Sequence, residues 1–194
     1  MDQRPQEIES RKLIHLPVVA IAEGKVLGRV DELIFDPKQQ SLLGVRISGN
    51  HGRDGAFVDC GRIRRLGPFA VVVMEEADLQ RSDDHDRARD VLASGIRVRG
   101  AQVMTDAGEP AGRIDRVWMS PEGRVLRYRA SDGAFAFARG HEIMPADVQV
   151  IGEDAMIIAA SVVHPDAAPA AGAGPPVLTE FHRADSPDGE PVRH

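Results

Sequence analysis

Hydrophobic and polar residues alternate with a period of two along two stretches of the chain, 41–48 and 124–131. This period predicts a β-strand with one buried face, because successive side chains of a strand point to opposite sides. The positions predicted to point inward are Leu43, Val45, Ile47, Leu126, Tyr128 and Ala130. Those predicted to point outward are Gly44, Arg46, Ser48, Val125, Arg127 and Arg129. Further strands are expected near 12–22, 27–35, 55–60 and 70–75.

One segment of the chain occurs twice, at 24–31 and at 108–115, and contains Gly-Arg-Val-Asp in the first copy and Gly-Arg-Ile-Asp in the second. The offset is 84 residues, counted from Gly28 to Gly112, and the similarity continues through the turns into the alternating stretches at 41–48 and 124–131. Self-similarity at this length indicates two copies of a small domain rather than a solenoid of short repeats. The two glycines fall inside strand-like runs, where glycine indicates a bulge or a closely packed backbone.

The fold class expected from these patterns is mainly all-β, with two small β-barrels in tandem, a short helical linker between them and a disordered C-terminal tail. The expected parts are a flexible leader at 1–10, the first barrel at 11–76, the linker at 77–95, the second barrel at 96–162 and the tail at 163–194. Domains of this size bury only about 60% of the surface of their unfolded chain. The two barrels are therefore expected to fold as separate units that pack on each other or dimerise.

The linker and the tail have distinct compositions. The linker predicts a short helix that is capped by Ser82 or Asp83 and stopped by Gly95. The tail is rich in Pro, Ala and Gly and acidic overall. So few core-forming residues cannot offset the entropy of ordering the chain, which predicts disorder. Within the tail, Val177–His182 is a candidate docking motif.

Residues 16–73 and 96–159 share a pattern of apolar and turn positions. It begins with Leu16-Pro17-Val18, continues through the repeated glycine segment, and closes in the second copy with Met144-Pro145-Ala146-Asp147-Val148. This pattern resembles the PRC-barrel family, whose members include the cytoplasmic part of the H subunit of photosynthetic reaction centres and the C-terminal domain of a ribosome maturation factor. The first copy departs from it at Asp59–Ile63, which replaces the proline-acidic-valine step.

The resemblance implies small β-barrels that bind other macromolecules and perform no known catalysis. The expected function is therefore that of a non-enzymatic adaptor for protein–protein interaction or assembly, whose partner is another protein or a second copy of the chain. Two alternatives remain open: an RNA- or ribosome-associated maturation factor, and an accessory protein of a photosynthetic or electron-transport complex. Fold-level analogy carries this ranking.

Composition and charge limit the expected cellular location and the expected kinds of partner. The single cysteine, Cys60, excludes an internal disulfide, and the polar N-terminus has no hydrophobic signal region, so a cytoplasmic location is expected. The longest apolar run, 155–163, is too short to span a bilayer. A net charge of −6 and a pI of about 5.6 argue against broad nucleic-acid binding.

The residues that could carry chemistry do not form a catalytic, cofactor-binding or metal-binding signature. The glycines lack the spacing of a dinucleotide fingerprint or a P-loop. Asp83–Asp86 contains one histidine among acidic residues, without the ligand spacing of a calcium loop or a zinc site. His141 and Glu142 are adjacent on an expected strand and cannot converge. Cys60 with His51 lacks the local sequence of a catalytic cysteine.

Arginines are the remaining candidates for a binding surface. The possible interaction surface comprises Arg46, Arg62, Arg64, Arg65, Arg127 and Arg129. Guanidinium groups recognise phosphates and carboxylates alike, so this surface fits RNA or an acidic protein surface. Ordinary solvent-facing strand positions explain the same residues equally well.

Overall fold

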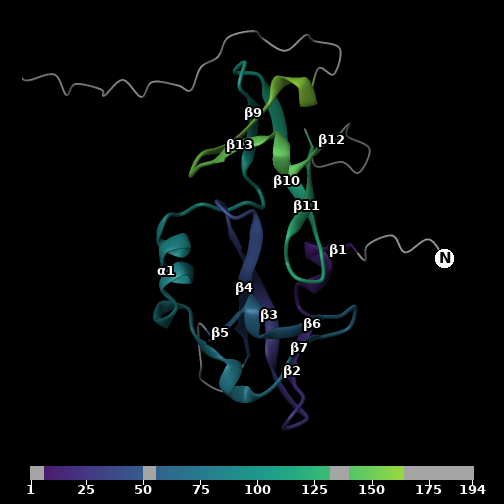
Figure 1. Ribbon diagram of the computed structural model, residues 1–194, viewed down its shortest axis with the longest axis vertical. Coiled ribbons are helices and arrows are strands. Elements are labelled where there is room, and N and C mark those ends of the chain that lie inside the picture. Colours follow the sequence, from purple (N-terminus) through teal and green to yellow (C-terminus); the bar gives the residue numbers. More distant parts are fainter. Residues whose placement is uncertain (1–6, 50–55, 132–139, 164–194) are drawn as a thin grey trace, which may run out of the picture.

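The computed structural model describes residues 7–49, 56–131 and 140–163, and most of these residues lie in two curled β-sheets (Figure 1). One sheet is built mainly from the first half of the chain and the other mainly from the second half. This arrangement confirms the predicted fold class of two tandem barrel-like β-domains. The predicted tail, from residue 164 onward, and its motif at 177–182 lie outside the described residues.

The first sheet has seven strands in the order β6-β7-β2-β3-β4-β5-β8. Its strands are β2 (Pro17–Ala20), β3 (Lys25–Asp36), β4 (Ser41–Ser48), β5 (Ala56–Asp59), β6 (Ile63–Leu66), β7 (Val71–Val73) and β8 (Gln80–Arg81). The α1 helix (Asp86–Ala93) follows β8 and covers the outer side of β3 in Figure 1. The β2–β7 pair is parallel and the other pairs are antiparallel.

The second sheet repeats this topology, with the order β12-β11-β10-β9-β14-β13. Its strands are β9 (Gln102–Thr105), β10 (Pro110–Met119), β11 (Val125–Ser131), β12 (Gly140–Ile143), β13 (Val148–Ile151) and β14 (Ala155–Ile158). The short 3-10 helices are η1 (Ser10–Leu13), η2 (Cys60–Arg62), η3 (Glu76–Asp78), η4 (Ser82–Asp84), η5 (Pro145–Asp147) and η6 (Ala160–Val162). Each of β9 to β14 takes the place that β2 to β7 hold in the first sheet, so the sequence repeat is a structural repeat.

The seventh strand of the second sheet comes from the N-terminus of the chain. The β1 strand (Ile8–Glu9) pairs antiparallel with Met119 and Trp118 of β10. The prediction of a flexible leader over 1–10 is therefore corrected for Ile8 and Glu9, which extend the sheet of the other repeat, and for Ser10, which is buried at the start of η1. Leader residues 1–6 lie outside the described residues.

The predicted alternation of inward and outward side chains is correct for the later part of both stretches, 41–48 and 124–131. In the first part of each stretch the alternation is shifted by one residue. Val45, Ile47, Tyr128 and Ala130 point into the core, as predicted. The prediction is wrong at the start of both strands, where Leu42 and Val125 are buried in place of Leu43 and Leu126. The cause is a register shift in each hairpin, between Ile34 and Phe35 and between Trp118 and Met119. Leu43 packs instead on the small cluster beneath α1.

The linker helix begins later than predicted. Its N-cap is His85, whose Nδ1 accepts a hydrogen bond of 3.1 Å from the backbone N–H of Ala88. The predicted caps, Ser82 and Asp83, begin a 3-10 turn instead. The predicted stop at Gly95 is confirmed, since this glycine has a φ of 70° and its N–H bonds the Leu92 carbonyl.

The two repeats meet through the tips of equivalent hairpins. Ser41 forms an antiparallel bridge with Arg124. The Leu42 N–H donates to the Gly123 carbonyl at 2.7 Å, and the Val125 N–H donates to the Gln40 carbonyl at 3.0 Å. Apolar residues of both sheets also form one continuous cluster. The two repeats thus pack on each other, one of the two arrangements expected for such small domains, and whether each folds alone stays a prediction.

Candidate functional site

The arginines predicted as an interaction surface are distributed over both sheets. Arg46 lies 2.8 Å from Glu32 and 3.4 Å from Asp31. Arg127 lies 2.7 Å from Glu7 and 3.4 Å from Glu142, and its guanidinium stacks 4.0 Å from the centre of the Trp118 ring. These two guanidinium groups are therefore already partnered by carboxylates.

The other four arginines are less constrained. Arg62 has a distant carboxylate, Asp78 at 3.9 Å. Arg64 and Arg65 are exposed on β6, at an edge of the first sheet, and Arg129 is half-buried on β11 of the second sheet. Four of the six arginines thus belong to the first repeat and two to the second, and their role as an interaction surface stays a prediction.

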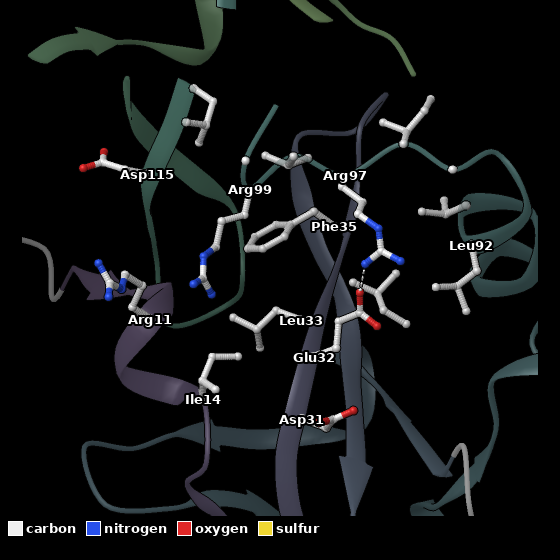
Figure 2. A pocket seen from close by; sticks show the side chains of 17 residues that line it. Arg11, Ile14, Asp31, Glu32, Leu33, Phe35, Leu92, Arg97, Arg99 and Asp115 are labelled. Atoms are coloured by element: carbon white, nitrogen blue, oxygen red, sulfur yellow. Dashed lines mark hydrogen bonds and ion pairs between the residues drawn. The ribbon is translucent and has the colours of Figure 1, made fainter. Parts of the chain in front are cut away.

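A cleft of about 590 Å³ opens where the two repeats meet (Figure 2). We call it the inter-repeat cleft. Four parts of the chain line it: η1 with Ile14, β3 from Asp31 to Phe35, the 91–100 segment at the end of α1 and beyond, and β10 at Ile114 and Asp115. This volume falls within the range of about 300–1,000 Å³ that is typical of ligand sites, which are often found between domains.

Two equivalent segments flank the inter-repeat cleft, 11–16 and 96–101, and each leads into the first strand of its own repeat. We call them the entry segments. In the first, the His15 N–H bonds the Val30 carbonyl, and in the second, the Gly100 N–H bonds the Ile114 carbonyl, both at 2.8 Å. His15 and Gly100 also share a positive φ, 68° and 85°. The cleft therefore lies between matching parts of the two repeats.

Both entry segments are anchored in the core and present an arginine beside an isoleucine to the cleft. Leu13 and Val98 are the buried anchors. The first segment presents Arg11 and Ile14, and the second presents Ile96 and Arg99. When the two entry segments are aligned, Arg11 corresponds to Ile96 and Ile14 corresponds to Arg99. The cleft thus has a cationic and an aliphatic side chain at each of two related corners.

A second surface feature occurs once in each sheet. It is a row of outward-facing side chains that crosses four neighbouring strands. We call these rows the outer apolar stripes. The first follows the register Arg65–Val72–Val19–Val26 across β6, β7, β2 and β3. The second follows Val150–Ile157–Met104–Pro110 across β13, β14, β9 and β10. Every position but Arg65 is apolar, whereas the outer face of a solvated sheet is ordinarily polar.

The first stripe is the more extensive of the two. Val26 is 60% exposed, and Ile21 and Met74, two residues beyond Val19 and Val72, are 50% and 45% exposed. In the second stripe Val150 is 53% exposed. Contiguous exposed apolar side chains on a soluble domain mark interaction surfaces.

The residues considered for catalysis or metal binding have structural contacts. His85 caps α1, and its Nε2 lies 3.1 Å from Asp59. His141 and Glu142 pair with consecutive residues of β11 and so alternate in direction along β12. His51 lies outside the described residues. Among the residues that the structure describes, no three His, Cys, Asp or Glu side chains gather as metal ligands.

The thiol of Cys60 lies in the contact between the repeats, with Sγ 3.6 Å from the Glu122 carbonyl oxygen. Burial, with a smaller contribution from the Asp59 charge, raises the pKa of Cys60 to about 11. We expect alkylation of the folded chain by iodoacetamide at mildly alkaline pH to be slower than that of the urea-unfolded chain by on the order of 100-fold, because only the thiolate reacts. Mass spectrometry follows the single cysteine directly. Equal rates in the two states would contradict this assignment.

Reasoning from the sequence missed Arg11, Arg97 and Arg99, and it missed the stripes. An offset alignment of the entry segments would have shown the exchanged arginine and isoleucine positions. The stripes depend on which strands are neighbours, and two of the pairings that build them, β2–β7 and β9–β14, join strands distant in sequence.

Comparison with known proteins identifies a family whose model matches this chain. The model of the PRC-barrel domain matches the chain in two segments, residues 5–80 and 95–163. A search among curated proteins found no match. Within the described part of the chain, none of the helices has both the length and the apolar character needed to cross a membrane.

Proposed function

The chain belongs to the PRC-barrel family, and from this premise we propose that it acts as a non-enzymatic adaptor that holds a partner protein through its outer apolar stripes. The single observation that supports the proposal is the repeated stripe, present at equivalent strands of both sheets. Burying such side chains under a partner is favourable by about 25 cal/mol for each Å² of apolar surface removed from water. A stripe in each repeat provides two contact sites on one chain, as an adaptor requires.

The proposal predicts that a charge in the stripe abolishes partner binding. The tagged full chain, its Val26→Asp variant and its Val150→Asp variant are used to recover proteins from an extract of the source organism, followed by mass spectrometry. At least one variant is expected to lose a partner by tenfold or more (about 1.4 kcal/mol or more), because an unpaired carboxylate would be buried at the contact. Light scattering of the purified chain covers the case in which the partner is a second copy.

The matched control is Phe69→Ser. Phe69 is 83% exposed in the turn between β6 and β7, outside the stripe, so its loss removes an apolar surface residue without touching the proposed contact. This variant is expected to recover the same partner as the unmodified chain. Undiminished binding by both stripe variants, or equal loss with Phe69→Ser, would refute the role of the stripes.

Association with RNA or ribosomes receives less support. Arg46 and Arg127 are each within 3.4 Å of two carboxylates, so binding a phosphate there would require breaking existing ion pairs. Salt-sensitive co-sedimentation with ribosomal particles that disappears in an Arg127→Ala, Arg129→Ala double variant would favour RNA over the adaptor. If the captured partner belongs to a photosynthetic or electron-transport complex, the adaptor is an accessory protein of that complex.

A further inference from the structure

Arg11, Arg97 and Arg99 line the inter-repeat cleft together with three carboxylates, and these carboxylates also have arginine partners outside the lining, Arg46 and Arg116. Glu32 lies 2.6 Å from Arg97 and 2.8 Å from Arg46, and Asp31 lies 3.4 Å from Arg46. Asp115, the third carboxylate of the lining, has Arg116 at 4.0 Å. Each carboxylate of the cleft therefore has a guanidinium within ion-pair distance.

Arg11 and Arg99 differ from these paired groups. Both are exposed, and among the residues that the structure describes neither has a carboxylate within 4.0 Å. Figure 2 shows the Arg99 side chain extending from the second entry segment towards Leu33, and Arg11 on the η1 side of the cleft. Two guanidinium groups are thus available for a ligand, one on each entry segment.

The surface beside these arginines is aliphatic and aromatic. Ile14, Leu33 and Ile96 are half-buried, so part of each side chain faces the cleft. Phe35, only 7% exposed, forms part of the lining beneath them. A ligand that satisfies both features carries carboxylates next to aliphatic groups.

We propose that the inter-repeat cleft binds an acidic-aliphatic peptide segment of a partner protein, with Arg11 and Arg99 holding its carboxylates and Ile14, Leu33 and Ile96 contacting its aliphatic side chains. The planar guanidinium fork matches a carboxylate in a bidentate arrangement. The proposal rests on the proposed function, because the peptide belongs to a partner protein, but it assigns a site separate from the stripes.

The geometry favours a peptide over two other anionic ligands. A nucleic-acid backbone would place phosphates near Arg11 and Arg99 but has no aliphatic side chains to cover Ile14, Leu33 and Ile96. A fatty acid requires an enclosed apolar channel, whereas this cleft is open to solvent and its aliphatic residues are divided by charged ones. A peptide that carries both acidic and aliphatic residues fits the two guanidinium groups that have no carboxylate partner among the described residues, and the aliphatic lining beside them.

The test measures fluorescence anisotropy of a labelled peptide of alternating leucine and glutamate residues with the full-length chain at low salt. Three matched peptides replace Glu by Gln, Glu by Lys, or Leu by Ser, and dodecanoate serves as a competitor. The Leu-Glu peptide is expected to bind at least about tenfold more tightly than each matched peptide, because the cleft contacts both its carboxylates and its aliphatic side chains. Displacement by dodecanoate at concentrations below those of the free peptide would overturn the assignment to a peptide.

Arg11→Gln and Arg99→Gln are each expected to weaken binding of the Leu-Glu peptide by about tenfold, the effect of one charge-assisted hydrogen bond. Arg64→Gln, which removes an exposed arginine from β6, is the control and is expected to bind like the unmodified chain. Unchanged thermal unfolding of all three variants shows that the fold is intact. Equal binding by the chain and by the Arg11→Gln, Arg99→Gln double variant would overturn the proposal.

The failure of this proposal is distinguishable from failure of the adaptor role. If Val26→Asp or Val150→Asp loses a partner while no peptide of the panel binds, the stripes hold the partner and the assignment of the cleft is wrong. If no partner depends on the stripes but the peptide binds and requires both arginines, the cleft assignment stands and the stripe proposal falls.

Discussion

Replacing Asp36 by alanine is expected to lower the free energy of unfolding by about 3 kcal/mol at neutral pH. Asp36 is 1% exposed at the end of β3. Its carboxylate accepts two hydrogen bonds from Arg87 of α1, at 2.7 and 2.8 Å, and two more from the backbone N–H groups of Lys38 and Gln39. The substitution removes the cap of the turn and the attachment of the helix together. Urea unfolding followed by circular dichroism measures the loss.

The contribution of Asp36 depends on pH in a defined direction. The side-chain hydrogen bond from Arg87 is the main cause that lowers the pKa of Asp36 in the folded chain. A carboxylate with a lowered pKa stabilises the fold above its unfolded pKa of about 3.9, and this stabilisation disappears as the pH falls from there through the folded value. The stability difference between the unmodified chain and Asp36→Asn is therefore expected to be constant above about pH 5 and to shrink in more acidic solution.

The repeat supplies a matched control for this prediction. Ser120 occupies the position of Asp36 in the second repeat, and its hydroxyl accepts one hydrogen bond of 3.3 Å from the Glu122 N–H. Ser120→Ala is expected to cost less than about 1 kcal/mol. If Asp36→Asn were as stable as the unmodified chain at neutral pH, the charge of Asp36 would have no part in holding α1.

Gly44→Ala is expected to destabilise the protein by about 3 kcal/mol, through overpacking rather than backbone strain. Gly44 lies in the middle of β4, and an added Cβ atom would overlap the Val58 carbonyl oxygen and the Phe57 ring. The carbonyl belongs to the β4–β5 ladder and cannot move without breaking it. Phe57, fully buried, packs against Ala88 and Val91 of α1, so its displacement would loosen the helix as well. Thermal and urea unfolding report the change.

Gly108→Ala is the contrasting variant. Gly108 has a φ of 83°, and nothing lies within 4 Å of an added Cβ atom. Its substitution therefore carries only the strain of a left-handed conformation, about 1–2 kcal/mol. An equal loss of stability in the two variants would show that the space over Gly44 is not the determining factor.

The alternation of residues predicted the strands of both hairpins but not the points where their phase changes. Tyr128 and Ala130 point inward because period-two spacing has a direct geometric meaning. Leu42 replaces Leu43 in the core because the pairing with β3 skips Leu43, from Gly44 opposite Ile34 to Leu42 opposite Phe35, and no residue type in the sequence predicts this bulge. Likewise, both Ser82 and His85 can accept a hydrogen bond at a helix start, and only the packing of α1 on the sheet selects His85.

The candidate sites were less accessible to prediction than the fold. Arg127 was correctly placed on the outer face of its strand, but Glu7, which neutralises it, is 120 residues away in the sequence. The inter-repeat cleft is lined by four segments of the chain, so Arg11 and Arg99 line one site only when the two repeats pack together. Fold class depends on local periodicity, whereas a site depends on side chains that are distant in the chain.

The bridge between the hairpin tips has a consequence for how a duplicated chain differs from a single copy. Ser41 and Arg124 are equivalent positions, as are Leu42 and Val125 and also Gln40 and Gly123, so the contact is isologous and a lone repeat could form it only with another molecule. Covalent linkage replaces that bimolecular encounter by an effective concentration in the millimolar range. Assembly of the two halves is consequently independent of expression level.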